Sequence, residues 1–149
     1  MQTVLFFREV AAMPFETRID VRYPDCDSMQ IVHHAVYPVW LEMARMDVFA
    51  KCGFDYTYAH SRGTDPAMVH LELDYGAPVT YPGSVLVTTR ITLCEGKKLA
   101  FAYEVRAEGA EKPNVRAKSF HIWVKDGAGY NIEEQLPEMF AGYRAALED

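Results

Sequence analysis

Apolar and polar residues alternate along residues 15–23 of the chain. A period of two is the pattern of a strand that buries one face. After a loop at residues 24–34 the pattern changes, and in residues 35–53 apolar side chains cover most of the circumference of a helix. Pro38 suits the first turn of this helix and Gly53 suits its C-terminal cap. The pattern therefore predicts a strand followed by a helix that is buried on most sides.

The period of two returns in four later segments, separated by short turn-like sequences: 67–79, 84–95, 99–108 and 114–125. Short connections between successive strands favour antiparallel pairing. Residues 54–66 between the helix and these strands are expected to be irregular, and a short helix is expected from about Pro137.

A single sheet must cover a helix that is apolar nearly all round, and a curved sheet wrapped around the helix meets this demand. The sequence thus predicts an α+β fold with a curved five-stranded antiparallel sheet around a long central helix. An outer face with Val85, Val87 and Thr89 is expected to pack on a partner subunit, so that no stable monomer forms.

The length of 149 residues suggests a single domain, with residues 1–14 as an N-terminal extension and a core at about 15–145. The formal net charge of -6 argues against a nucleic-acid partner and disfavours binding to an anionic membrane surface. No apolar run reaches transmembrane length. Three widely spaced cysteines, Cys26, Cys52 and Cys94, indicate neither a disulfide framework nor a zinc site and favour a cytoplasmic location.

The stretch "YPDCDSMQIVHH" at residues 23–34 concentrates the polar chemistry of the chain directly before the helix. Asp27 could be a catalytic carboxylate, or it could cap a turn with its side chain. His34 could cap the helix, and Asp25 is expected to be a solvated loop acid. A metal site is disfavoured because adjacent histidines usually diverge and no His-x-His or His-x3-His pair supports them.

The order of elements, together with "RYPDCDSMQIVHHAVYPVWLEMAR" and "LDYGAPVTYPGSVLVTT", resembles hotdog-fold acyl-CoA thioesterases, most closely the 4-hydroxybenzoyl-CoA thioesterase family. The resemblance covers roughly residues 15–145. The positions of the family pattern are occupied here by Tyr23, Asp27, Ile31, Val32, His34 and Tyr37. Two positions depart from it: Gln30 stands where the family usually has Gly, which can adopt a positive φ, and Val36 stands where it often has Asn.

The resemblance implies that Asp27 is the catalytic base or nucleophile and that the backbone N–H of His34 polarises the thioester carbonyl. A helix N-terminus suits this second role because its first N–H groups are unpaired and carry partial positive charge. Tyr23 either orients Asp27 or packs in the core, since parity places it on the inward strand face. Tyr37 and Val32 are candidates for contacting the acyl group.

The resemblance also implies that basic residues at one hairpin contact the phosphates of coenzyme A, and Lys97 and Lys98 occupy that hairpin. Coenzyme A is part of the substrate, and no separate cofactor is expected. Glu42 is a reserve base on the helix, although an ion pair with Arg45 is the simpler interpretation.

The resemblance therefore predicts a thioesterase that acts on an aryl or short to medium acyl-CoA, as a homodimer or homotetramer with the active site at a subunit interface. Two alternatives stay open. A hotdog hydratase or dehydratase would pair a histidine with an acid across the interface. The other alternative is a non-catalytic regulator that binds acyl-CoA. It stays open because Gln30 and Val36 depart from the family pattern in the loop and near the start of the helix.

Overall fold

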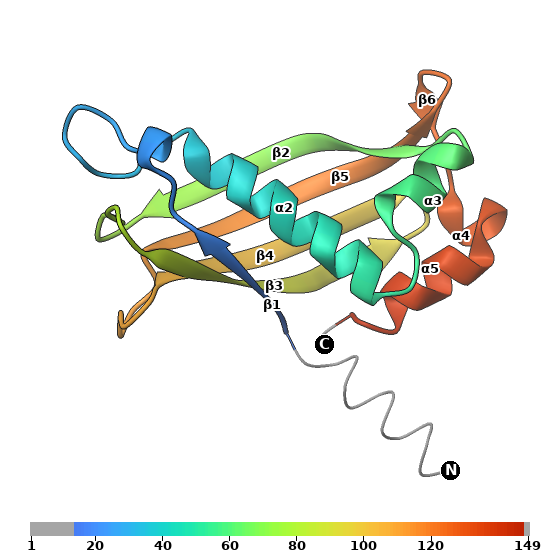
Figure 1. Cartoon of the computed structure of the whole chain (residues 1–149). Helices are drawn as coiled ribbons and strands as arrows, with labels where there is room; N and C mark the ends of the chain where they lie inside the picture. Colours follow the sequence, from blue (N-terminus) through green and yellow to red (C-terminus); the bar gives the residue numbers. More distant parts are fainter. Residues whose placement is uncertain (1–13, 148–149) are drawn as a thin grey trace, which may run out of the picture.

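The structure of the chain is a computed structural model that describes residues 14–147. The N-terminal extension expected at residues 1–14 lies outside the described residues, apart from Pro14. In the described part, one antiparallel sheet curves around one long helix (Figure 1). This is the expected α+β hotdog arrangement.

Five long strands form the sheet in the order β1-β3-β4-β5-β2, and every neighbouring pair is antiparallel. They are β1 (Phe15–Asp20), β2 (Asp65–Tyr75), β3 (Ser84–Glu95), β4 (Lys98–Ala107) and β5 (Val115–Lys125). The two-residue strand β6 (Ala128–Gly129) adds a short hairpin to the end of β5. β1 and β2 are the two edges, so β2 pairs on one side only among the described strands.

The central helix α2 (Val36–Lys51) crosses the concave face of the sheet (Figure 1). It begins near the predicted position, and Pro38 lies in its first turn, where a missing N–H costs no hydrogen bond. It ends at Lys51, and Gly53 follows the C-cap with a φ of 91°, a conformation that Gly adopts easily because it has no Cβ atom. The residues that α2 buries are Tyr37, Trp40, Leu41, Ala44, Arg45, Val48 and Phe49.

The prediction that one set of β3 side chains forms an outer face of the sheet is wrong. Val85, Val87 and Thr89 are each at most 1% exposed, because they lie opposite Ile19, Thr17 and Phe15 of β1 on the side that faces α2. The convex face carries charged residues instead, and a hollow of about 350 Å³ on it is lined by Glu72, Asp74, Arg90, Glu104, Arg116 and Lys118, among others. This part of the convex face is therefore polar, and Val85, Val87 and Thr89 offer no surface to a partner subunit.

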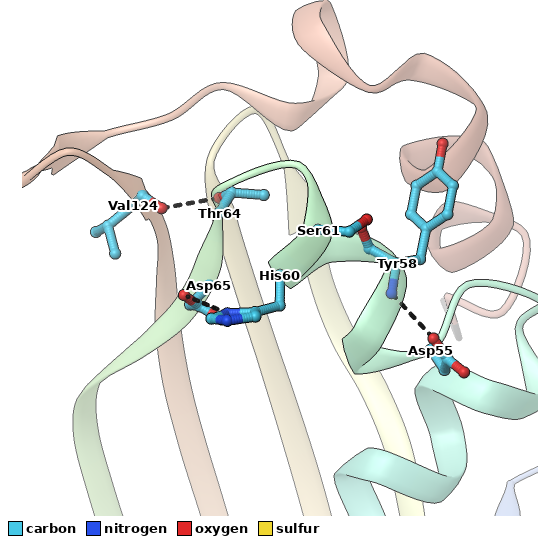
Figure 2. A network of polar contacts seen from close by, with 7 residues as sticks. All are labelled: Asp55, Tyr58, His60, Ser61, Thr64, Asp65 and Val124. Carbon is cyan, nitrogen blue, oxygen red and sulfur yellow. Dashed lines mark hydrogen bonds and ion pairs between the residues drawn. The ribbon is translucent and has the colours of Figure 1, made fainter.

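Residues 54–66 are more ordered than the irregular segment predicted, because they include helix α3 (Tyr56–Ser61). Figure 2 shows its N-cap, in which the Asp55 side chain accepts a hydrogen bond from the backbone N–H of Tyr58 at 3.0 Å. Figure 2 also shows the Thr64 hydroxyl donating to the carbonyl of Val124 at 2.9 Å, which ties the start of β2 to β5. The helix is too short to show a clear helical periodicity in the sequence. Asp55, a favourable N-cap residue, was the sequence feature that could have predicted it.

Two C-terminal helices, α4 (Ile132–Gln135) and α5 (Pro137–Arg144), cover the end of the sheet opposite the loop before α2 (Figure 1). The start of α5 at Pro137 confirms the predicted position. The helix buries Met139 and Tyr143 completely, both at 0% exposure. This end of the molecule is consequently closed by side-chain packing.

All three cysteines are free thiols, as predicted. Burial raises the pKa of Cys52 to about 11 and that of Cys94 to about 12, so these two thiols are poorly reactive near neutral pH. Within residues 14–147, no helix combines the length and the apolar character that crossing a membrane requires.

Candidate active site

The first strand ends at Asp20, and the chain turns through a short 3-10 helix at Tyr23–Asp25. This turn breaks the alternation that placed Tyr23 on the inward face. Tyr23 is 77% exposed and packs edge-to-face on Tyr81, with ring centroids 5.7 Å apart. The prediction that Tyr23 faces inward is therefore wrong, because parity holds only while the backbone remains extended.

The loop that follows is a small hairpin closed by backbone hydrogen bonds. Cys26 and Val32 form an antiparallel bridge, and the N–H of Asp27 donates to the carbonyl of Ile31 at 2.9 Å. Gln30 closes the tip by donating to the carbonyl of Asp27 at 2.9 Å. Gln30 has a φ of 62°, so it adopts the left-handed conformation that Gly adopts more easily. The loop therefore keeps a positive φ at this position although Gln replaces the Gly that the family usually has, and the backbone of Gln30 is strained as a result.

Asp27 lies at the tip of this hairpin, and its side chain is half-buried. Oδ1 accepts a hydrogen bond from the backbone N–H of Met29 at 2.8 Å. This is the turn-capping contact that was the alternative to catalysis. This contact engages one of the two carboxylate oxygens.

The N-cap of α2 is Ala35, without a side-chain cap hydrogen bond, so the cap considered for His34 is absent and His33 instead holds the chain just before the helix. The Nδ1 atom of His33 accepts from the N–H of Ala35 at 3.0 Å, and its carbonyl accepts from the N–H of Val36 at 3.0 Å. The N–H of His34 donates to no acceptor within the part of the chain that the structure describes. The Tyr75 hydroxyl donates to the carbonyl of His34 at 3.0 Å, which fixes the peptide on its other side.

Asp27 lines two cavities. The first, of about 160 Å³, is also lined by His34, Tyr37, Val32 and Tyr75. Asp27, His34 and both predicted acyl-contacting residues are thus brought together around one hollow. Burial raises the pKa of Tyr37, which keeps its hydroxyl neutral.

The second cavity, of about 430 Å³, lies along the outer limb of the loop, and the residues lining it are Tyr23, Pro24, Cys26, Asp27, Gln30 and Tyr81. Tyr23 therefore borders a cavity that Asp27 shares, although it does so from an exposed turn. Asp27 is the one residue that lines both of these cavities.

The prediction that Asp25 is solvated is wrong. Asp25 is 1% exposed, and its carboxylate accepts from the backbone N–H of Arg22 at 2.7 Å and from the Arg22 Nη2 at 2.8 Å. The hydrogen bond to Asp25 raises the pKa of the Arg22 guanidinium. The 3-10 turn turns the Asp25 side chain inward, which the alternation of the strand could not foretell.

The reserve base and its proposed partner lie apart from this site. Glu42 is exposed on α2 and lines neither of the cavities that contain Asp27. Arg45 is buried and donates from Nη1 to the Tyr103 hydroxyl at 3.1 Å, so the predicted ion pair with Glu42 is replaced by a contact with the sheet. Nothing in this geometry connects Glu42 with Asp27.

Lys97 and Lys98 also lie apart from Asp27 within one chain. Lys98 pairs with Ile122, which in turn pairs with Ala67 at the beginning of β2. The Asp27 cavity includes Tyr75, at the end of β2. The two lysines and Asp27 are therefore at opposite ends of the sheet in a single subunit.

Two residues of the site were missed from the sequence. His33 was considered only as a metal ligand, yet its ring accepts the N–H of Ala35, the N-cap residue of α2, and no sequence signal pointed to this contact. Tyr75 comes from β2, far along the chain, and nothing in its local sequence connects it with His34. Among the described residues, no group of three or more His, Cys, Asp or Glu side chains lies close enough together to hold a metal ion.

Comparison with known proteins places this geometry in context. The profile of the thioesterase-like superfamily matches residues 21–147, which include the whole loop and all of α2. A protein of Bacillus subtilis (strain 168), named "Putative acyl-CoA thioesterase YneP", is 33% identical over 130 residues, covering 86% of this chain and 94% of the relative.

Solved structures agree with this match. A hypothetical protein from Thermus thermophilus, TT1821, superposes with a TM-score of 0.81 at 31% identity and covers 88% of this chain and 98% of its own. The DHNA-CoA thioesterase from Staphylococcus aureus superposes with a TM-score of 0.84 at 25% identity and covers 88% of this chain and 89% of its own. The similarity thus extends over nearly the whole domain.

Proposed function

This chain belongs to the thioesterase-like superfamily, and from that premise we propose that it hydrolyses an acyl-CoA thioester to a free acid and coenzyme A. In this reaction the carbon–sulfur bond breaks, the oxygen of water joins the acyl carbon, and the sulfur leaves as a thiolate that takes up a proton. The relatives named as thioesterases support this reaction class. We propose an aryl or short to medium acyl group as the substrate.

The observation that carries the proposal is the shared cavity of Asp27 and His34. Attack on a thioester develops negative charge on the carbonyl oxygen, and an unpaired N–H at the start of a helix can stabilise that charge. The His34 N–H meets this requirement because it has no acceptor among the described residues. The Asp27 carboxylate lines the same cavity and can approach the carbonyl carbon.

Asp27 acts in this proposal either as a general base or as a nucleophile. As a base, it takes a proton from the water that attacks the acyl carbon. As a nucleophile, it forms an acyl-aspartyl anhydride that water then hydrolyses. A single turnover in ¹⁸O-labelled water tests the nucleophilic route. Attack of water on the aspartyl carbonyl of the anhydride leaves the label in the Asp27 carboxylate and gives an unlabelled acid, whereas general-base catalysis puts the label in the acid and leaves Asp27 unlabelled. Label in Asp27 therefore identifies Asp27 as the nucleophile.

We propose that the active protein is a dimer or a dimer of dimers formed through the edge of β2. This strand is 11 residues long, pairs only with β5 among the described strands, and exposes Met68 and Val69 at 42% and 61%. On α2, Val39 and Met43 are exposed at 53% and 47%. A long unpaired edge beside exposed apolar side chains favours pairing with a second copy.

Such a dimer also gives Lys97 and Lys98 a role. Antiparallel pairing of two β2 edges brings the beginning of one β2 beside the end of the other. Since the lysines align with the beginning of β2 and the Asp27 cavity with its end, each subunit would present its lysines toward the other's cavity. The active site would then lie at the interface, and the lysines would meet the coenzyme A phosphates in trans.

The test is the substitution Asp27→Asn, assayed on a panel of aryl and aliphatic acyl-CoAs by detection of the free thiol. The near-isosteric amide cannot act as base or nucleophile, so kcat should fall by on the order of 10² or more. Binding of coenzyme A should persist. The Asp20→Asn variant is the matched control, because the Asp20 side chain is 84% exposed on the same segment.

Two results would redirect the assignment. If Asp27→Asn keeps the rate while Glu42→Gln loses it, the helix carboxylate is the catalyst. If the unaltered protein hydrolyses no acyl-CoA yet binds several, the regulator is correct and the hydrolase is wrong. Hydration of an enoyl-CoA without thiol release would instead favour the hydratase.

The trans arrangement has its own test. Changing Lys97 and Lys98 to Ala should raise KM for acyl-CoA and leave kcat nearly unchanged, which is the mark of lost uniform binding. The effect should fade with an acyl-pantetheine substrate that lacks the nucleotide. Mixing this double variant with Asp27→Asn should restore sites in heterodimers, and a single sedimenting species of 17.0 kDa would contradict the dimer.

A further inference from the structure

Asp25 is a buried acid two residues before the proposed catalytic carboxylate. Its side chain is 1% exposed and accepts three hydrogen bonds, all from Arg22: from the backbone N–H at 2.7 Å, from Nε at 3.2 Å and from Nη2 at 2.8 Å. The Arg22 side chain is itself 72% exposed. The pair therefore closes the 3-10 turn with the acid inside and its cation at the surface.

The backbone of Asp25 makes a second connection, to the approach of α2. Its carbonyl accepts the N–H of His33 at 2.9 Å. The bridge between Cys26 and Val32 is the next pairing along the hairpin. Asp25 thus lies at the base of the hairpin, at the point where its two limbs are joined.

The two reacting groups leave this base on opposite limbs. Asp27 follows Asp25 by two residues on the outgoing limb, and His34 follows His33 by one residue on the returning limb. The distance between the carboxylate and the His34 N–H therefore depends on how firmly Asp25 holds both limbs. A displacement of about 1 Å between reacting groups can cost on the order of 10² in rate.

From this connectivity we propose that Asp25 is a positioning residue for the hydrolysis, and that its ion pair with Arg22 sets the geometry between Asp27 and His34. The inference rests on the proposed function, but it concerns a residue that touches neither of the two cavities. An Asn at this position would turn an NH₂ group toward the Arg22 donors or lose one of the acceptor oxygens. A buried donor without an acceptor is costly, so the turn should loosen.

The first experiment compares Asp25→Asn with Asp20→Asn in the full chain. For Asp25→Asn, kcat should fall by on the order of 10 to 10² while KM and the dissociation constant for coenzyme A stay within about twofold. Asp20 forms an exposed pair with Arg18 at 3.9 Å, so Asp20→Asn should leave both constants unchanged. This pair has the same residue types as Asp25 and Arg22 but lacks burial, which makes it the matched control.

The second experiment separates positioning from mere stability and does not depend on activity. Amide hydrogen exchange at His33 should speed up in Asp25→Asn, because its acceptor is the Asp25 carbonyl. Arg22→Met should act in the same direction as Asp25→Asn, and Arg22→Lys should recover part of kcat because it keeps a cation beside the acid. The equivalent changes at Arg18 are the controls. Arg22→Lys also keeps the test informative if Asp25→Asn does not fold.

Several outcomes would overturn the role of Asp25. If Asp25→Asn lowers the melting temperature but keeps kcat per folded subunit and the slow exchange at His33, the residue is structural only. If the apparent kcat falls only in proportion to the unfolded fraction while KM is unchanged, the same conclusion holds. A fully active Asp27→Asn would instead refute the catalytic role of Asp27 on which this inference rests, whatever Asp25→Asn does, and the absence of any acyl-CoA hydrolysis by the unaltered protein would refute the proposed function, so the failures are distinguishable.

Discussion

The two ends of the sheet differ in their packing: one end contains cavities, and the other is closed by aromatic side chains. At one end the Asp27 loop enters α2 with an unpaired N–H at His34, a strained φ at Gln30 and two cavities. At the other end the aromatic side chains of Phe49, Trp123 and Tyr143 are each at most 1% exposed and pack with ring centroids 5.1–6.1 Å apart. One end offers polar groups to a ligand, whereas the other excludes solvent.

The closed end also contains polar groups, but it pairs many of them inside the protein. The Tyr143 hydroxyl donates to the carbonyl of Phe54 at 2.6 Å, and burial raises its pKa. In the adjoining core, the Tyr103 hydroxyl and the Nε2 of His121 both bond to the Ser119 hydroxyl, at 2.6 and 2.8 Å. The difference teaches that the strained backbone of the open end is held by the hydrogen bonds of its own loop, since strain persists only where the surrounding structure holds it.

The largest expected effect is at the closed end. Phe49→Ala should lower the free energy of unfolding by about 3–5 kcal/mol, because it removes a buried ring and leaves a cavity. The kcat of the folded protein should stay within about twofold, since the ring lies far from Asp27. Urea unfolding at a fixed protein concentration and the thiol assay measure the two quantities.

Phe120→Ala is the control for this change, because Phe120 is 38% exposed. It should alter stability by only about 0.5 kcal/mol, as surface substitutions usually do. A loss of kcat in Phe49→Ala without a loss of stability would contradict the separation of the two ends.

The second effect is a pH dependence from the buried core. Burial lowers the pKa of His121 from 6.5 to about 4, so the folded protein holds this ring neutral. The unfolded chain binds the proton first as the pH falls, so stability is complete above about pH 6.5 and declines toward about pH 4. Chemical unfolding across this range measures the slope.

His121→Gln should flatten that slope, because the amide can still bond to Ser119 but does not titrate. His70→Gln is the matched control, since the His70 side chain is 56% exposed and should leave the slope unchanged. An equal flattening by both variants would show that the effect is not specific to the buried ring.

The smallest effect concerns the strain at the open end. Gln30→Gly should raise the free energy of unfolding by at most about 1 kcal/mol, because relief of the positive φ is partly offset by the added freedom of the unfolded chain. A looser hairpin tip should also lower kcat by a few-fold, on the order of 2 to 5. Thermal melts and steady-state kinetics test both.

Asp126 is the matched position at the closed end, where it adopts a φ of 51° between β5 and β6. Asp126→Gly should leave kcat unchanged, and its stability gain should be smaller because Asp tolerates this conformation better than Gln. If Asp126→Gly lowers kcat as much as Gln30→Gly does, the effect on kcat is not specific to the Asp27 loop.

The elements were largely predictable because each carries its own periodicity. The run at residues 84–95 became β3 with the predicted bounds, and the buried helix appeared within two residues of its expected ends. Two failures share one cause. Tyr23 was placed by continuing the alternation of β1, and Asp25 was expected to be a solvated acid of the loop, but a 3-10 turn exposes Tyr23 and buries Asp25.

The face of β3 was also misassigned, since a period of two shows that two faces differ but not which one meets the helix. Only the pairing of β3 with β1 decided that Val85 and Val87 point inward.

By itself, then, the sequence determined the fold class, the order of the elements and the loop on which Asp27 lies, because these follow from local patterns and from motif similarity. The tertiary structure alone decided that Tyr75 reaches His34, that Asp25 is buried with Arg22, and that Lys97 lies at the far end from Asp27. Some of these residues are far apart along the chain, and others are joined by a turn. In neither case does the contact produce a periodic pattern in the sequence. They depend on how the strands pair and on where the backbone departs from extended geometry.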